Sequence, residues 1–159
     1  MYYLAADHAG FELKEKIKEH FKLRSISYKD FGAFSENSVD YPDLAHPVVK
    51  AIQEKEGLVK GVLVCGSGIG MSIVANRYTG IRAALCSTVD AVKLARQHND
   101  ANILVLGAKT IDPKDIELLL EAFEKTAFEG QRHLRRIHKI DRIFTMQEQI
   151  FSTDLEEID

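Results

Sequence analysis

Residues 61–70 read GVLVCGSGIG, a run of apolar residues followed directly by a glycine-rich loop. The apolar part lacks the alternation of a half-exposed strand, so it predicts a strand that is buried on both faces. A second run of this kind, Ile103 to Leu106, predicts another central strand. Strands of this type occur in parallel sheets that carry helices on both faces. The two runs therefore indicate an α/β fold.

Outward from these runs, short strands alternate with segments of helical periodicity. Strands are expected at Tyr2 to Ala6, Ser27 to Phe31, Gly61 to Cys65, Ile81 to Cys86 and Ile103 to Leu106. Asp112 followed by Pro113 marks the start of a later helix. We predict a doubly wound, Rossmann-like sheet of five parallel strands in the flavodoxin-type order 2-1-3-4-5.

The chain of 159 residues is expected to form a single domain, because no repeat, low-complexity stretch or linker divides it. Residues 131–159 add an amphipathic C-terminal helix and tail beyond the last helix that the sheet requires. The apolar residues of this segment are Leu134, Ile137, Ile140, Ile143, Phe144 and Ile150. We expect it to pack on a second subunit, in a homodimer or a dimer of dimers. Docking back on its own domain is the alternative.

Composition excludes several classes of protein. Lys plus Arg number 21 and Asp plus Glu number 24, and the net charge of −3 argues against nonspecific nucleic-acid binding over the whole surface. No apolar run approaches the roughly 18 residues of a membrane span, and no signal-peptide pattern opens the chain, so we expect a cytoplasmic protein without membrane contact. Cys65 and Cys86 lack the spacing of a disulfide framework or a metal motif, and the histidines are scattered, so no metal site is predicted.

Ligands of open parallel sheets bind beyond the carboxyl ends of the strands, where the strand order reverses. Here that place lies between the first strand, followed by Asp7 and His8, and the third, followed by the glycine loop after Cys65. The loop lacks the Lys of a phosphate-binding P-loop, the spacing of a dinucleotide fingerprint and the first glycine of a nucleophile elbow. It offers instead a thiol, unhindered backbone N–H groups and a helix that starts near Met71, an arrangement that stabilises negative charge.

Simpler interpretations of these residues stay open. Cys65 is alternatively a small buried core residue, Asp7 a helix cap and His8 a surface residue. Cys86 ends a strand without a glycine loop, so we expect it in the core.

Two polar clusters lie further along the chain, at Arg96 to Asp100 and at Arg132 to Arg136. Arg132 and Arg136 are four residues apart, so they share one helical face and can hold one phosphate together, with a solvated basic face as the alternative. A helix that returns antiparallel to the strands ends at the edge opposite the crevice. His98 is therefore not expected to reach Cys65 of its own subunit, and if it is catalytic a neighbouring subunit must supply it.

Taken together, these motifs resemble in order and spacing the type B ribose-5-phosphate isomerases, within a group that includes the galactose-6-phosphate isomerase subunits. The resemblance covers residues 1 to about 143. The matching segments are Asp7 to Gly10, Asp40 to Pro42, Cys65 to Ser72, Asn76, Gly80 to Ala83, Arg96 to Asp100 and Gly130 to His133.

The resemblance implies an aldose–ketose isomerase without metal or other cofactor, which interconverts ribose 5-phosphate and ribulose 5-phosphate through an enediolate. By position it implies Cys65 as the base that moves the proton between C1 and C2, Ser67 as a group that stabilises the enediolate, and His98 as the acid/base that opens the furanose ring. The implied substrate-binding residues are Asp7, His8, Tyr41, Gly66, Gly68, Ile69, Gly70, Asn99, Arg132 and Arg136. Among these, His8 and the two arginines would hold the phosphate.

Ser67 stands where the family commonly has Thr, which keeps the hydroxyl group but loosens its orientation. Two other functions stay open at this point. One is the same reaction on a hexose phosphate, galactose 6-phosphate or allose 6-phosphate, and the other is a noncatalytic sugar-phosphate sensor. A flavodoxin-like redox protein is disfavoured, because the phosphate loop expected after the first strand is absent.

Overall fold

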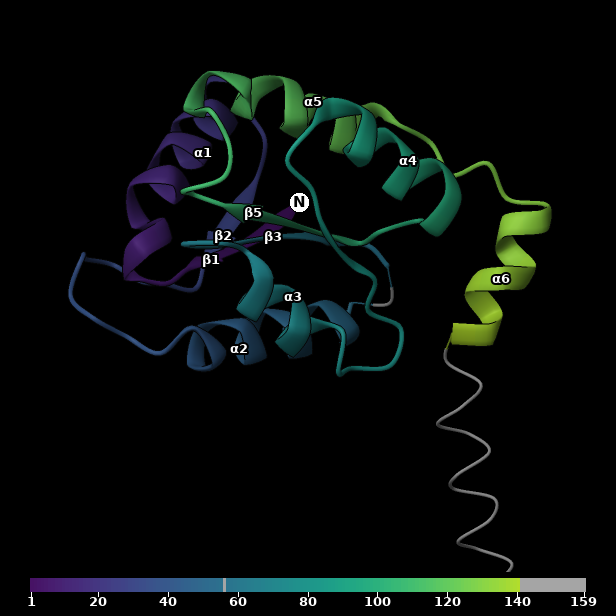
Figure 1. Ribbon diagram of the computed structural model, residues 1–159, viewed down its shortest axis with the longest axis horizontal. Helices are drawn as coiled ribbons and strands as arrows, with labels where there is room; N and C mark the ends of the chain where they lie inside the picture. The colour runs from purple at the N-terminus through teal and green to yellow at the C-terminus, as the bar shows by residue number, and fades with distance from the viewer. Residues whose placement is uncertain (56, 141–159) are drawn as a thin grey trace, which may run out of the picture.

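The computed structural model describes residues 1–55 and 57–140 of the chain (Figure 1). The strands are β1 (Tyr2–Ala6), β2 (Tyr28–Asp30), β3 (Lys60–Cys65), β4 (Ala83–Leu85) and β5 (Ile103–Gly107). The α-helices are α1 (Phe11–Leu23), α2 (Tyr41–Gln53), α3 (Ile69–Ala75), α4 (Val89–Asn99), α5 (Ile116–Lys125) and α6 (Arg132–Ile140). Short 3₁₀ helices, His8–Gly10 and Pro113–Asp115, precede α1 and α5, and the Asp112 side chain caps the second of them as expected.

All five strands are parallel, which confirms the predicted fold class, and their order is β2-β1-β3-β5-β4. The order differs from the expected one only in its last two strands. Every residue of β5 is buried, whereas β4 has three residues, of which Ala84 is half-buried and Leu85 exposed. A short, half-exposed strand fits the edge of a sheet, and a fully buried strand fits its interior. The reversal of strand order between β1 and β3 is where we expected it.

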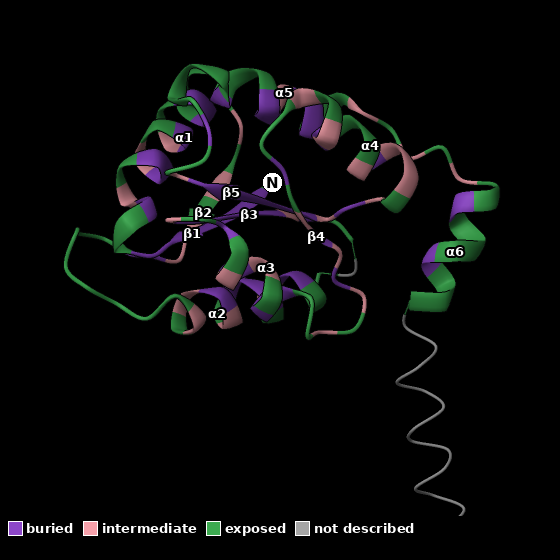
Figure 2. Ribbon diagram, in the orientation of Figure 1, coloured by how far each residue is buried: buried purple, intermediate pink, exposed green. Residues whose placement is uncertain are grey.

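The helices form two layers around the sheet, with α1, α4 and α5 on one face and α2 and α3 on the other (Figure 1). Alternate residues of β1 point into different cores, so that Tyr2 and Leu4 pack under the first layer and Tyr3 and Ala5 under the second. Buried residues line the sides of the helices that face the sheet (Figure 2). Apolar burial on both faces therefore holds the carboxyl ends of β1 and β3 next to each other.

One buried ion pair fastens the edge strand β2 to α1. The Lys14 side chain is fully buried, and its Nζ donates to the Asp30 carboxylate oxygens at 2.7 and 2.6 Å. Burial acts to raise the pKa of Asp30, but hydrogen bonds from Lys14, the Gly32 N–H and Lys18 outweigh it, and the pKa is lowered. The carboxylate is therefore charged in the folded protein and holds a buried cation in place.

The last described helix, α6, lies beyond the end of α4 and apart from the sheet (Figure 1). His133 and Ile137 are its buried residues, whereas Leu134 and Ile140 are 44% and 48% exposed. Residues 141–159, including the predicted apolar residues Ile143, Phe144 and Ile150, lie outside the described part of the chain. No helix among the described residues is long and apolar enough to cross a membrane.

Candidate active site

Cys65 ends β3, and the chain turns sharply behind it into α3. The Cys65 thiol is buried, and its Sγ accepts a hydrogen bond from the Gly68 N–H at 3.1 Å. Gly68 has a φ of 78°, in the left-handed region that favours glycine. The next helix begins at Ile69, two residues earlier than expected, because this turn already aligns the backbone for it. This backbone donor holds the sulfur in one position at the carboxyl end of β3.

In the rest of the glycine loop, Gly70 packs against Tyr41 and Ser67 is exposed to solvent. A Cβ atom at Gly70 would lie 2.7 Å from Cζ of Tyr41, so only glycine lets this aromatic ring sit against the loop. Ser67 is exposed, and its Oγ accepts from the Ile69 N–H at 3.3 Å. Tyr41 opens α2, so the loop has an aromatic wall on one side and an accessible hydroxyl on the other.

Asp7 and His8 follow β1, on the side of the glycine loop where the neighbouring strand ends. Asp7 is buried, and its Oδ1 accepts from the Gly10 N–H at 2.9 Å, so it does cap the first 3₁₀ helix. His8 is exposed, and its Nδ1 accepts from the Val39 N–H at 3.3 Å in the segment that leads to α2. A Cβ at Gly10 would lie 2.8 Å from the Val64 carbonyl oxygen, which shows how closely the segment after β1 packs against β3. The structure thus places Asp7 and His8 near the glycine loop, as the strand order predicted, and places Tyr41 against that loop, as the resemblance implied.

His98 and Asn99 lie near the opposite ends of the strands, where the strands begin. The carbonyl oxygen of Asn102, just after α4, accepts from the N–H of Gly61 at the start of β3, at 2.8 Å. Cys65 lies four residues further along that strand, a separation of about 13 Å at 3.3 Å per residue. Among the described residues, the His98 side chain contacts Glu129 and His133 rather than the glycine loop.

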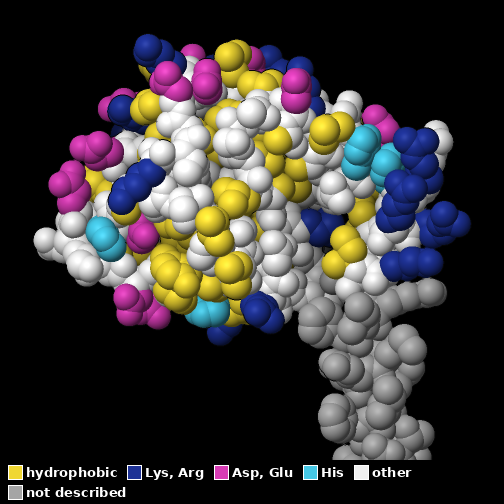
Figure 3. All heavy atoms as spheres, in the orientation of Figure 1, with side chains coloured by type: hydrophobic (Ala, Val, Ile, Leu, Met, Phe, Trp, Pro, Cys, Tyr) yellow, Lys and Arg dark blue, Asp and Glu magenta, His cyan; other side chains and the backbone are white. Residues whose placement is uncertain are grey.

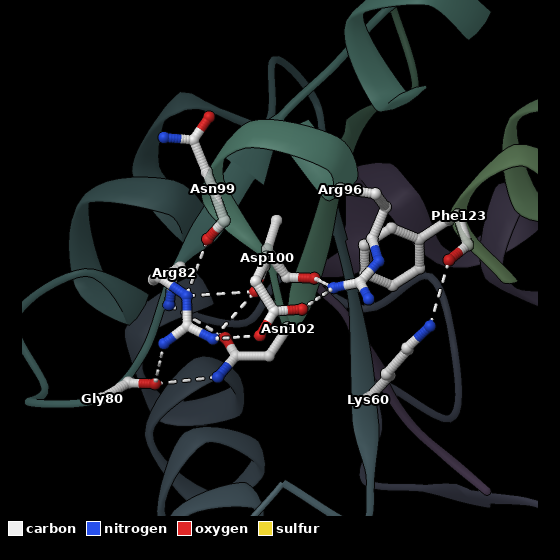
Figure 4. A network of polar contacts seen from close by, with 9 residues as sticks. Lys60, Gly80, Arg82, Arg96, Asn99, Asp100, Asn102 and Phe123 are labelled. Atoms are coloured by element: carbon white, nitrogen blue, oxygen red, sulfur yellow. Dashed lines mark hydrogen bonds and ion pairs between the residues drawn. The ribbon is translucent and has the colours of Figure 1, made fainter. Parts of the chain in front are cut away.

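A group of ion pairs and hydrogen bonds fixes the end of α4 next to Asn99 (Figure 4). Asp100 ends the helix in the left-handed region, with a φ of 44°. Its carboxylate accepts from Arg96 at 2.7 Å and from Arg82 at 3.0 Å. The Nε of Arg82 also donates to the Asn99 carbonyl oxygen at 2.8 Å. In the sequence, the i, i+4 spacing of Arg96 and Asp100 indicates that these two side chains can pair. No pattern in the sequence indicates that Arg82 joins them.

A second group of residues surrounds the His98 ring. The imidazoles of His98 and His133 stack with centroids 4.3 Å apart and 2° between their planes. Oε2 of Glu129 lies 3.6 Å from Nε2 of His133 and 4.0 Å from Nε2 of His98. Burial lowers the pKa of His133 most, the neighbouring His98, Arg132 and Arg136 act in the same direction, and Glu129 only partly opposes them.

The side chains of His98, Glu129 and His133 could also be considered as a metal site. Their ligand atoms lie within 4.8 Å of one another, which is the case for no other group of this kind among the described residues. The surroundings disfavour a cation. Nε of Arg132 donates to Nε2 of His133 at 3.2 Å, which occupies the lone pair that a metal would need. Sequence spacing did not reveal the cluster, because its members come from residues 98, 129 and 133.

The α6 helix presents a strongly basic surface, and positively charged side chains gather on that side of the molecule (Figure 3). Arg132 and Arg136 lie on this helix, and both are exposed. Their spacing places them one turn apart on one face, as predicted. Two guanidinium groups so arranged suit a phosphate, which accepts several charge-assisted hydrogen bonds at once.

Cys86 is buried after β4, where burial raises the pKa of its thiol to about 11. It is therefore protonated at neutral pH and packs with the core, as expected.

Comparison with known proteins gives consistent results. A sequence model of the ribose/galactose isomerase family matches residues 2–140. A ribose 5-phosphate isomerase from Thermotoga maritima is 51% identical, with a TM-score of 0.85 over 89% of this chain and 97% of that one. Ribose-5-phosphate isomerase B from Mycoplasma genitalium, solved with bound ribulose-5-phosphate, is 36% identical, with a TM-score of 0.86 over 91% and 95% of the two chains. Ribose-5-phosphate isomerase B of Escherichia coli is 38% identical over 86% of this chain and 91% of its own.

Proposed function

This chain belongs to the ribose/galactose isomerase family, and from that premise we propose that it interconverts ribose 5-phosphate and ribulose 5-phosphate. The observation that carries the proposal is the buried Cys65 thiol, held by a glycine-loop N–H at the carboxyl end of β3. The structural neighbour with bound ribulose-5-phosphate supports the choice of a pentose phosphate. The enzyme would act in the cytoplasm, where thiols stay reduced.

In this proposal Cys65 carries the proton between the two carbons. The thiolate takes the proton from C2 of the open-chain aldose, and the electron pair of the broken C–H bond moves to form the enediolate. The same group returns the proton to C1, while the hydroxyl proton at O2 moves to O1. The negative charge on the enediolate oxygens is stabilised by Ser67 and by the N–H groups between Gly66 and Gly70 that are not already used, since those of Gly68 and Ile69 donate to Cys65 and Ser67.

His98 opens the furanose ring, a step that precedes the proton transfer. It accepts the proton of the O1 hydroxyl and donates a proton to the ring oxygen as the C1–O4 bond breaks. Asn99 and Asp7 contact the sugar hydroxyls, and Tyr41 lines the pocket. His8, Arg132 and Arg136 hold the phosphate, which supplies binding energy from a group that takes no part in the reaction.

The separation of Cys65 from His98 requires two copies of the chain at each site, so we propose a homodimer or a dimer of dimers. Apolar side chains gather over the face formed by α2 and α3 (Figure 3). Ile69 and Ile73 of α3 are 54% and 53% exposed there, and Phe34 is 75% exposed. An apolar surface next to the glycine loop suits a partner that brings its own α4 and α6 to that loop.

The first test compares kcat/KM for ribose 5-phosphate, allose 6-phosphate and galactose 6-phosphate, without added metal. We expect a clear preference for the pentose, abolished by Cys65→Ala and retained by the matched variant Cys86→Ala. Preference for a hexose phosphate would contradict the proposed substrate, and turnover that survives Cys65→Ala would contradict the role of the thiol.

Mixing two inactive variants tests whether sites form between subunits. Cys65→Ala and His98→Ala are refolded together in equal amounts. Alone, Cys65→Ala should be inactive, and His98→Ala should turn over ribose 5-phosphate only as fast as the ring opens in solution, a rate that is subtracted. In a random mixture of C2 dimers, half of the molecules are hybrids with one intact site each, so about a quarter of the wild-type activity should return. No recovery, in a mixture shown to contain hybrids, would mean that one chain supplies both groups.

A further inference from the structure

His133 and Glu129 have no assigned part in the reaction, yet both contact the side chain that opens the ring. The loop that carries Glu129 is tied to α4, because the Glu129 N–H donates to the Gln97 carbonyl oxygen at 3.0 Å. His133 is buried at the first turn of α6, with its ring parallel to that of His98. The His133 side chain is therefore held by burial. Glu129 is held at its backbone, while its side chain is 47% exposed.

The hydrogen bonds of His133 define its charge. Nε2 of His133 accepts from Nε of Arg132, so this nitrogen carries a lone pair and the ring proton resides on Nδ1. The direction of the His133 pKa, lowered chiefly by burial, agrees with an uncharged ring. The titratable or charged groups that face it are His98 from α4, Glu129 from the preceding loop, and Arg132 and Arg136 from α6.

We propose that His133 and Glu129 are positioning residues for the reaction. The neutral His133 ring is a flat platform that holds the His98 imidazole in one orientation, and the Glu129 carboxylate, 4.0 Å from Nε2 of His98, helps to orient the same ring. Through its own Nε2, His133 also orients Arg132. One side chain thus connects the ring-opening acid/base to the phosphate-binding arginines.

This inference rests on the proposed function, and the ketose direction of the reaction offers a way to isolate it. Ribulose 5-phosphate has no furanose ring, because its C5 oxygen carries the phosphate. A variant with impaired ring opening therefore turns over the ketose at a rate proportional to enzyme concentration. From ribose 5-phosphate its rate levels off instead, limited by spontaneous ring opening in solution.

The central comparison is between His133→Ala, which removes the platform, and His133→Phe, which keeps a flat ring but loses the acceptor for Arg132. We expect His133→Ala to lose about 10- to 100-fold in the aldose direction, with a rate that levels off as enzyme is added, because misplacing a reacting group by about 1 Å is this costly. His133→Phe should retain proportional rates in both directions and a kcat within about threefold of wild type, with a raised KM. Glu129→Gln should lower the aldose-direction rate without changing the KM.

A matched control is His20→Phe, since His20 is also buried and also lies 4.0 Å from a glutamate, Glu117, but far from this site in α1. It should leave both directions unchanged. The stacking itself is read by proton NMR of the full-length protein, independently of turnover. The His98 ring protons should show an upfield ring-current shift that His133→Phe keeps and His133→Ala removes.

Two results would overturn the inference. One is a His133→Ala enzyme with unchanged His98 ring shifts and aldose rates that still rise in proportion to enzyme. The other is an equal loss in both directions for the Ala and Phe variants, which would make His133 a purely structural residue. Failure of the proposed function is a different outcome, because the wild-type protein would then fail to turn over ribose 5-phosphate while the ring shifts still report the stacking.

Discussion

Replacing Gly68 with alanine tests whether the conformation of the glycine loop keeps the Cys65 thiol ready. Gly68 has a φ of 78°, and its N–H donates to the Cys65 sulfur at 3.1 Å. An L-residue in the left-handed region costs about 1–2 kcal/mol. The new Cβ would also lie 3.1 Å from the Leu106 carbonyl carbon and 3.2 Å from the Gly107 nitrogen, and it would contact the side chain of Leu85.

The two backbone atoms belong to the central strand β5 and cannot move aside as a flexible side chain can. Overpacking of this kind adds about 1–3 kcal/mol, so Gly68→Ala should lower the free energy of unfolding by roughly 2–5 kcal/mol in total. Displacement of the N–H from sulfur removes one preorganised donor, a loss of about 100-fold in kcat by analogy with oxyanion-hole donors. Urea denaturation and steady-state kinetics measure the two effects separately.

Gly57→Ala is the matched control for backbone strain alone. Gly57 has a φ of 84°, and a Cβ there would have no atom within 4 Å. It should lose only about 1–2 kcal/mol of unfolding free energy and leave kcat unchanged. If Gly68→Ala is no less stable than Gly57→Ala and keeps its kcat, then the tight turn does not position the thiol, and the reasoning is wrong.

Three further predictions concern charge. Asp30→Asn leaves the Lys14 ammonium buried without its main partner, so urea denaturation should show a loss of about 3–5 kcal/mol in unfolding free energy. Arg136→Ala should raise the KM for ribose 5-phosphate by about tenfold or more with little change in kcat, whereas Arg135→Ala on the same helix should change neither. Because folding lowers the pKa of His133, the unfolded chain binds more protons below about pH 6.5, so the unfolding free energy should fall on acidification, and less in His133→Phe. Denaturation curves at about pH 5 and pH 7.5 check this sign.

Much of the fold follows from local patterns. The unbroken apolar run of Ile103 to Leu106 marks a strand that is buried on both faces, and β5 is such a strand. The same run also indicates the position of β5 in the sheet, because a strand that is buried on both faces belongs in the interior and not at the edge. The weaker run around Ala84 and Leu85 becomes a short, half-exposed strand, which does. Strand lengths and burial, weighed against each other, would have placed β4 outside β5.

The candidate site was predictable only where it depends on topology. The approach of Asp7 to the glycine loop follows from the reversal between β1 and β3, and the distance of His98 from Cys65 follows from the direction of α4. The grouping of His98 with Glu129 and His133 depends on how the chain after α5 returns to the end of α4, which no local pattern specifies. Glu129 and His133 are four residues apart, but Glu129 lies before α6 and the turn at Gly130 separates them, so the helical rule for this spacing did not predict their contact.

The proposed catalytic residues lie at opposite ends of the strands, and this constrains how the fold can perform the proposed isomerisation. Cys65 lies at the carboxyl end of β3, whereas α4 returns to the start of that strand, about 13 Å away at 3.3 Å per residue. Side-chain rotation cannot close that gap, and the strand between the two edges lies in the buried core. A second copy can close it, since a two-fold axis that brings α4 and α6 of one chain to the glycine loop of the other must also produce the reverse contact. Two identical sites then arise from one interface, and ring opening and proton transfer would each depend on residues that a single chain keeps apart.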